Sequence, residues 1–139
     1  METQEQKTCQ QRVKENMDGR VSDLRTLLDL YRKDPEANDE ELGNFNEYGL
    51  AFDYVLASTF DDQEEGYFRY QLSWGGPSDE FRFFTDAEFN CYKIEYWFLD
   101  WYDGARLPLY GENRLLLLDI FSDFKDCGTL EHVFKKAME

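Results

Sequence analysis

Histidine, cysteine and proline are scarce in this 139-residue sequence, and it contains no long apolar run. Cys9, Cys91 and Cys127 are odd in number and widely spaced, which is typical of reduced thiols in a cytoplasmic protein and not of a disulfide framework. No stretch approaches the roughly 20 apolar residues that a transmembrane helix needs. The first segment, METQEQKTCQ, lacks the basic and apolar regions of a secretory signal. We therefore expect a cytoplasmic protein that does not bind membranes.

The same scarcity argues against most kinds of catalytic or metal site. His132 is the single histidine, and no serine or cysteine with a nucleophile signature accompanies it. A zinc site needs about four nitrogen or sulfur ligands, and the sequence has no C-x-x-C spacing. Gly75-Gly76-Pro77 has neither the length nor the lysine of a phosphate-binding loop. We expect no enzyme, no cofactor and no metal; an enzyme that uses carboxylates alone, such as Asp100 with Asp103, is the minor alternative.

Bases are absent from residues 34–65, and this gap dominates the charge distribution. The stretch holds eleven Asp and Glu, so it contributes −11 to a formal net charge of −15. Such a block repels nucleic acid and anionic membranes and attracts a basic protein surface. Five aromatic residues are interleaved with the acids: Phe45, Tyr48, Phe52, Tyr54 and Phe60. The pattern favours docking into a basic groove, although a solvated acidic face that only aids solubility is the simpler explanation.

We expect the partner to contact acidic and aromatic residues from this block and from the segment around Trp101. In this hypothesis the carboxylates stand for phosphates, and Tyr48 and Trp101 are the anchors. Asp100 and Asp103 flank Trp101, and a mixture of aromatic and acidic side chains suits an interface. The candidate residues are Asp39, Glu40, Glu41, Glu47, Tyr48, Asp61, Asp62, Glu64, Glu65, Asp100, Trp101 and Asp103.

The apolar residues between Val13 and Tyr31 recur at steps of three and four, which predicts an amphipathic helix. Asp34-Pro35 should end it, because the residue before a proline is disfavoured in the helical region. Gly19 weakens the middle and predicts a kink or a break. We expect the apolar stripe to dock on the chain's own sheet; a coiled-coil-like seam that forms a homodimer is the alternative.

Alternating patterns predict an antiparallel sheet of three or four strands. The clearest strand covers residues 67–74 and places Phe68, Tyr70, Leu72 and Trp74 on one face. A longer strand at 91–101 places Tyr92 and Ile94 on one face and has apolar groups on both, which is typical of a central strand. The remaining expected elements are strands at 50–58 and 80–84 and turns at 61–66, 75–78, 85–90 and 103–105.

Two helices are expected after the sheet, with Asn113 and Thr129 as their N-caps and Cys127-Gly128 between them. The prediction is therefore an α+β fold, an antiparallel meander with an N-terminal helical segment and two C-terminal helices. We expect a single domain over residues 1–139, divided into a helical segment (1–34), an acidic segment (35–66), the sheet (67–105) and the helices (112–138).

Two segments are too idiosyncratic to be explained by turns alone: LSWGGPSDEFRF at 72–83 and EYWFLDWYDGA at 95–105. Over residues 48–105 the sequence resembles small acidic proteins that plasmids and phages carry. The resemblance implies an accessory protein of a mobile element, a category that includes anti-restriction and anti-CRISPR proteins that imitate DNA. The motifs of the well-known anti-restriction families are not present.

The hypothesis for function is a non-enzymatic inhibitor with an acidic, DNA-mimicking surface. Its partner would be a basic nucleic-acid-binding protein, such as a restriction or CRISPR defence complex. The alternative is an immunity protein or antitoxin-like module that neutralises one basic partner. Direct binding of nucleic acid is not expected at a net charge of −15.

Overall fold

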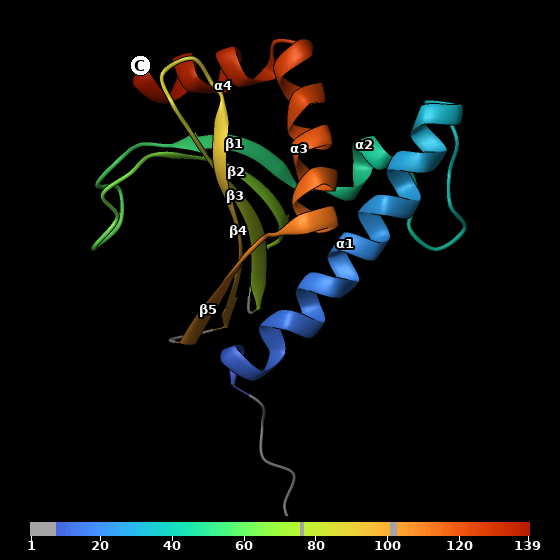
Figure 1. The fold of residues 1–139 in the computed structure, drawn as a ribbon, viewed down its shortest axis with the longest axis horizontal. Coiled ribbons are helices and arrows are strands. Elements are labelled where there is room, and N and C mark those ends of the chain that lie inside the picture. The colour runs from blue at the N-terminus through green and yellow to red at the C-terminus, as the bar shows by residue number, and fades with distance from the viewer. Residues whose placement is uncertain (1–7, 76, 101–102) are drawn as a thin grey trace, which may run out of the picture.

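The computed structural model describes residues 8–75, 77–100 and 103–139. It is an α+β fold in which a five-stranded antiparallel sheet carries its helices on one face (Figure 1). The strands follow one another in sequence order across the sheet, so the connections form a simple meander. The elements are α1 (Cys9–Lys33), α2 (Phe45–Tyr48), β1 (Ala51–Val55), β2 (Tyr67–Ser73), β3 (Ser78–Thr85), β4 (Cys91–Asp100), β5 (Asp103–Pro108), α3 (Gly111–Asp126) and α4 (Thr129–Met138).

Helix α1 confirms the N-terminal helix that the periodicity predicts. It begins with a capping box in which the Thr8 hydroxyl accepts from the Gln11 backbone N–H and the Gln11 side chain accepts from the Thr8 N–H. It ends at Lys33, next to Asp34-Pro35. The predicted kink at Gly19 is wrong, because α1 is one continuous helix held by packing on both sides of the glycine.

The apolar stripe of α1 lies in the chain's own core, as expected. Val13, Val21, Leu24 and Leu28 are all buried there, and the helix packs against β4, β5 and α3. A homodimer seam through these side chains would require α1 to leave the sheet.

The inner face of the sheet is lined by aromatic side chains that the alternation predicts only in part. Phe68, Tyr70 and Leu72 point into the core, as expected. Trp74 does not, because it follows the end of β2 and is 76% exposed. Tyr92 lies near the start of β4 and is 49% exposed. A row of directly opposed residues crosses all five strands on this face: Phe52, Tyr70, Phe81, Tyr96 and Leu107.

The strand count differs from the prediction because the expected turn at 103–105 is the start of β5. Asp103 pairs with Asp100, and Ala105 pairs with Phe98 across a tight hairpin. The pair Asp103-Gly104 is typical of a turn, so the short strand β5 that begins there was not predicted. The weak strand expected at 50–58 is confirmed over the five residues of β1.

The two C-terminal helices are present, but their N-caps differ from the prediction. Helix α3 begins at Gly111, and its N-cap is Tyr110, three residues before the predicted Asn113. Helix α4 begins at Thr129, and Gly128, in the left-handed region at φ 83°, is its N-cap. The ring of Phe121 stacks on Phe83 at 4.7 Å, which fixes α3 on the sheet. Within the part of the chain that the structure describes, no helix is long and apolar enough to span a membrane.

Candidate functional site

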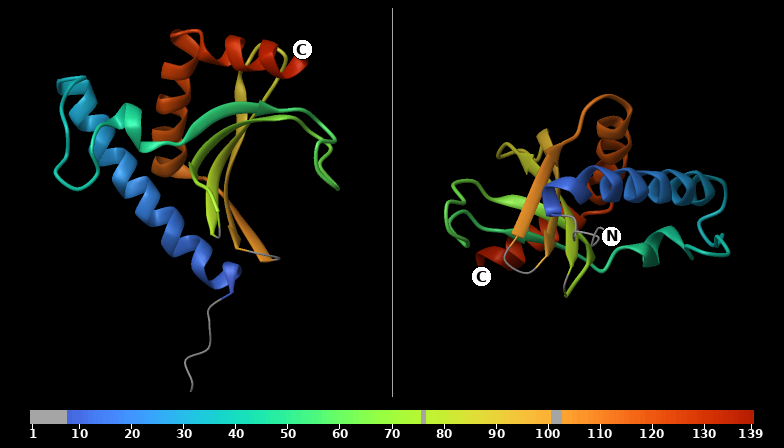
Figure 2. Two further views of the ribbon diagram at one scale, coloured as in Figure 1. Left: turned by 180° about the vertical axis from the view of Figure 1, so that it is seen from behind. Right: turned by 90° about the horizontal axis from the view of Figure 1, so that it is seen from below.

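The sheet has one uncovered face, because α1, α3 and α4 all pack on the other (Figure 2). Charged side chains form a row across the uncovered face, one from each of four neighbouring strands. The register places Asp53 opposite Arg69, Arg69 opposite Arg82, and Arg82 opposite Glu95. The Arg69 guanidinium donates two hydrogen bonds, of 3.0 and 2.7 Å, to the Asp53 carboxylate. Two neighbouring arginines thus lie between two carboxylates, so this face carries both signs of charge.

Arg82 is the centre of this face. Its guanidinium carbon lies 4.5 Å from the centroid of the Tyr67 ring and 3.7 Å from that of Trp97, so the cation is held between two aromatic rings. Its Nε donates to Glu80 at 2.7 Å, and Glu80 is only 3% exposed. Arg106 approaches Trp97 at 5.3 Å. A buried charge needs such partners, so this stack fixes the position of Arg82.

The loop at residues 56–66 is acidic and internally organised. Gln63 lies at its centre, and its side-chain oxygen accepts from the backbone N–H groups of Thr59 (2.9 Å) and Phe60 (3.0 Å). The amide nitrogen of Gln63 donates to the carbonyls of Leu56 (3.0 Å) and Glu65 (2.7 Å). These four bonds hold the backbone of the loop in one shape.

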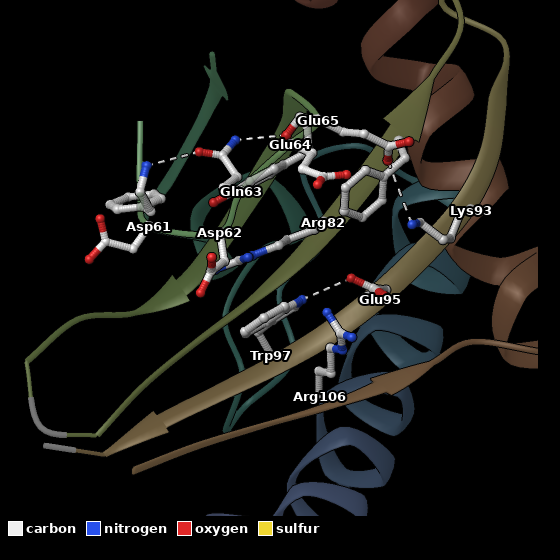
Figure 3. A pocket seen from close by; sticks show the side chains of 13 residues that line it. Asp61, Asp62, Gln63, Glu64, Glu65, Arg82, Lys93, Glu95, Trp97 and Arg106 are labelled. Atoms are coloured by element: carbon white, nitrogen blue, oxygen red, sulfur yellow. Dashed lines mark hydrogen bonds and ion pairs between the residues drawn. The ribbon is translucent and has the colours of Figure 1, made fainter. Parts of the chain in front are cut away.

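A pocket of about 450 Å³ lies between this loop and the uncovered face of the sheet (Figure 3). The loop is tied down at one end, where Glu65 accepts from the Tyr92 hydroxyl at 3.1 Å and approaches the Lys93 ammonium at 3.6 Å. Acids from the loop form one wall, and the opposite wall carries Arg82 and Arg106. We take the loop and this pocket together as the candidate site.

The predicted acidic surface is divided in the fold. Asp61, Asp62, Glu64 and Glu65 come together on loop 56–66, whereas residues 39–47 lie on the opposite side of the molecule, beside the C-terminal half of α1 (Figure 1). Between the two groups the chain runs the length of β1, an edge strand of the sheet, and this strand separates them. Glu40, Glu41 and Glu47 are exposed there, and the Asp39 carboxylate accepts from two backbone N–H groups of its own turn.

Asp100 and Asp103 lie apart from both acidic groups and hold the start of α1. Asp100 accepts from Arg12 at 2.8 Å, and Asp103 accepts from the backbone N–H of Cys9 at 2.8 Å. A carboxylate there satisfies an unpaired N–H of the first helical turn and complements the helix dipole. The bond from Cys9 lowers the pKa of Asp103. Trp101, the other expected anchor, lies outside the described residues.

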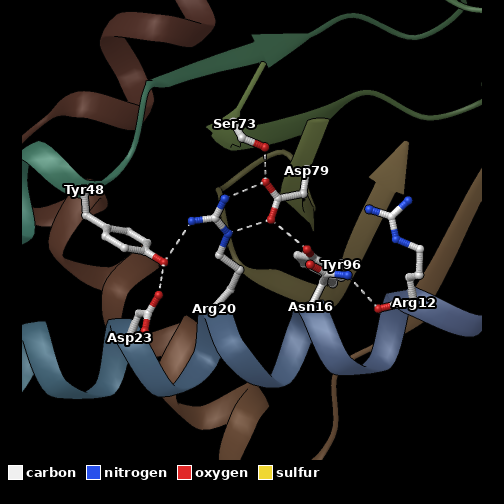
Figure 4. Close-up of polar contacts among 8 residues, drawn as sticks. All are labelled: Arg12, Asn16, Arg20, Asp23, Tyr48, Ser73, Asp79 and Tyr96. Atoms are coloured by element: carbon white, nitrogen blue, oxygen red, sulfur yellow. Dashed lines mark hydrogen bonds and ion pairs between the residues drawn. The ribbon is translucent and has the colours of Figure 1, made fainter. Parts of the chain in front are cut away.

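Tyr48 is half-buried and belongs to a polar network under the helices (Figure 4). Its hydroxyl donates to Asp23 at 2.6 Å and accepts from Arg20 at 3.0 Å. Arg20 also binds Asp79 through two bonds of 2.7 and 3.0 Å. The hydroxyls of Tyr96 (2.6 Å) and of Ser73 donate to the same Asp79 carboxylate. Tyr48 therefore joins α2 to α1 and is not a free anchor.

The titration of Tyr48 gives the first testable prediction. Burial and the bond to Asp23 raise the pKa of Tyr48 to about 12, against about 10 in an unfolded chain. Because the pKa of Tyr48 is higher in the folded state than in the unfolded state, the protonated hydroxyl contributes its full stabilisation below pH 10. This contribution is lost as the pH rises from 10 toward 12. We expect the urea midpoint of the wild type to fall over this range. Tyr48→Phe should fall less steeply between pH 10 and 12; equal slopes would contradict this role of Tyr48.

Nine residues that line the pocket were not among the sequence candidates: Phe60, Gln63, Tyr67, Arg82, Phe84, Lys93, Glu95, Trp97 and Arg106. Trp97 lies on the uncovered face of β4, where it lines the pocket. For Gln63 the sequence carries no signal, because its role depends on how the loop closes. Among residues 8–75, 77–100 and 103–139, no cluster of histidine, cysteine or acidic side chains is arranged to hold a metal ion.

Comparisons with known proteins give no relative: no family model, no curated protein and no solved structure matches the chain. Function is therefore inferred from the residues of the chain itself.

Proposed function

We propose that the protein is a non-enzymatic inhibitor that inserts its acidic β1–β2 loop, residues 56–66, into the basic groove of a nucleic-acid-binding protein. A restriction or CRISPR defence complex is the kind of partner that we expect. The loop carboxylates would occupy positions that phosphates take in the natural ligand, and exposed Phe60 would supply an apolar contact.

One observation carries the proposal: the loop is acidic, exposed and fixed in shape by Gln63. A loop that served only solubility would not need four hydrogen bonds from one side chain to hold it. Fixing a loop before binding lowers the entropy that association costs, so an ordered acidic loop suits recognition. A net charge of −15 also speeds encounter with a basic surface, an effect that salt weakens.

A second candidate function is an immunity protein or antitoxin-like module with one cognate partner. The mixture of positive and negative side chains on the uncovered face supports it, because Arg69, Arg82 and Arg106 have no counterpart in a row of phosphates. Such a mixed pattern is complementary to one partner surface and not to DNA-binding grooves in general.

The test is a phage plating assay in hosts that carry a restriction or CRISPR system active against that phage. Wild-type protein should restore plaques. A loop variant, Asp61→Asn with Asp62→Asn, Glu64→Gln and Glu65→Gln, should lose most of that effect, by roughly 10–100-fold, because the charges that steer and seat the loop are gone. Asparagine suits position 62, where the backbone has φ 58°.

The matched control carries the same change in charge on the other acidic segment: Glu36→Gln, Glu40→Gln, Glu41→Gln and Glu47→Gln. It should inhibit like the wild type if the β1–β2 loop is the working surface. With a purified target, added duplex DNA should displace a DNA mimic and leave an immunity protein bound. Equal inhibition by the loop variant, or no inhibition in any host, would contradict the proposal.

A further inference from the structure

Tyr67, in the wall of the pocket under the β1–β2 loop, has a buried hydroxyl that is unsatisfied within the described part of the chain. The residue lines the pocket and is 1% exposed, yet its hydroxyl has no hydrogen-bond partner among the described residues. Burial raises the pKa of Tyr67, so the group stays protonated and is available as a donor. A buried hydroxyl without a partner costs free energy, and a bound acceptor would remove that cost.

Two guanidinium groups line the same pocket as Tyr67. Arg82 packs on the Tyr67 ring and uses its Nε on Glu80, while its two terminal nitrogens make no hydrogen bond within the described ranges. The Arg106 guanidinium lies over the Trp97 ring, and Arg106 makes no ion pair with any of the described residues. A guanidinium with free N–H groups next to a phenol is a natural site for a carboxylate oxygen.

The opposite wall of the pocket would repel a ligand that is only anionic. It carries Asp61, Asp62 and Glu64. On the sheet, next to Arg82, Glu95 is 9% exposed, and among the described residues the Trp97 indole N–H is its one donor, at 3.1 Å. A ligand that is only cationic would meet the arginines instead. The acidic loop and the arginines on the sheet together favour a ligand that carries both signs of charge.

We propose that this pocket binds a free α-amino acid with an apolar side chain. Its carboxylate lies at the Tyr67 hydroxyl and Arg82, and its ammonium group faces the carboxylates of the loop. Phe60, Phe84 and Trp97 supply apolar surface for the side chain. A volume of about 450 Å³ suits a small ligand. This inference does not depend on the proposed function, because it needs no protein partner.

Calorimetry on the isolated protein tests it, with L-leucine, L-methionine and L-phenylalanine at millimolar concentration. At least one should bind, and its N-acetyl and carboxamide derivatives should bind at least tenfold more weakly, because each lacks one of the two charges. Absence of heat for all three, or equal binding of a parent and its derivatives, would overturn the proposal.

Tyr67→Phe isolates the hydroxyl. It should weaken binding of the same amino acid about tenfold while the melting temperature of the free protein stays the same or rises, since the hydroxyl has no partner to lose. Arg106→Gln should also weaken binding. Arg25→Gln makes the same change in charge on the exposed surface of α1 and should leave affinity unchanged. Wild-type affinity in Tyr67→Phe would refute the assignment of the carboxylate.

Discussion

Asp79→Asn is expected to lower the free energy of unfolding by about 3 kcal/mol, because it leaves the Arg20 charge without its partner. Asp79 is 3% exposed, and its carboxylate receives the bidentate bond from Arg20 and the hydroxyl bond from Tyr96. Burial alone would lower the pKa of Arg20, but the bonds to Asp79 and Tyr48 raise it above its ordinary value, so the cation persists. An asparagine can accept one of these bonds and cannot balance the charge.

Urea denaturation at neutral pH measures this loss. The matched control is Asp18→Asn, which removes a carboxylate from an exposed pair with Lys14 at 3.1 Å. Exposed pairs contribute little, so the control should stay within about 0.5 kcal/mol of the wild type. A small domain has a total stability of about 5–15 kcal/mol, so the two variants should be clearly separated. A change below about 1 kcal/mol in Asp79→Asn would show that the network is dispensable.

Phe68→Ala is expected to cost about 3–5 kcal/mol, the range for removing a fully buried aromatic ring. The ring is 0% exposed and contacts rings from three other parts of the fold. Tyr54 on β1 lies at 4.8 Å, Phe89 at 5.3 Å and Phe121 on α3 at 5.6 Å between centroids. Alanine would leave a cavity where the sheet, the β3–β4 turn and the helices meet.

Phe89 is a second reason to expect a large loss of stability in Phe68→Ala, in addition to the volume of the cavity. It has φ 65°, a left-handed conformation that is unfavourable for a bulky residue. Its ring is held by Phe68 and by Phe134 at 5.4 Å, so packing compensates the backbone strain. Leu115→Ala is the control, because Leu115 is 66% exposed on α3 and its loss should cost little. Similar denaturation midpoints for both variants would contradict the central role of Phe68.

Repeating patterns in the sequence were sufficient to predict most of the fold. The stripe from Val13 to Leu28 and the alternation from Phe68 to Leu72 each report a face that is buried along its whole length. Strand β5 and the N-cap of α3 were missed, because each depends on a few residues whose local chemistry favours another structure. Asp103 before Gly104 is typical of a turn, and Tyr110 has no capping side-chain bond to predict.

The candidate site was predicted less well, because its parts meet only in three dimensions. The acidic residues at 61–65 were found from composition, but those at 39–47 are carried to the other end of the molecule by the path of β1. Asp79 and Glu80 were unremarkable in sequence, yet both are buried and paired with arginines from different positions. Burial of a charge depends on tertiary packing, which a single sequence does not report.

The position of α1 also determines the order in which the chain can complete its core during synthesis. This helix is made first, yet the partner of Arg12 is Asp100, 88 residues later. At roughly 5–20 residues per second, the ribosome needs about 5–20 s to deliver that partner. Until then the leucine-rich stripe of α1 has no sheet to cover it, so the nascent chain presents a site that chaperones can bind. Because α1 packs on β4 and β5, it can reach its final contacts only after residue 108 has been made.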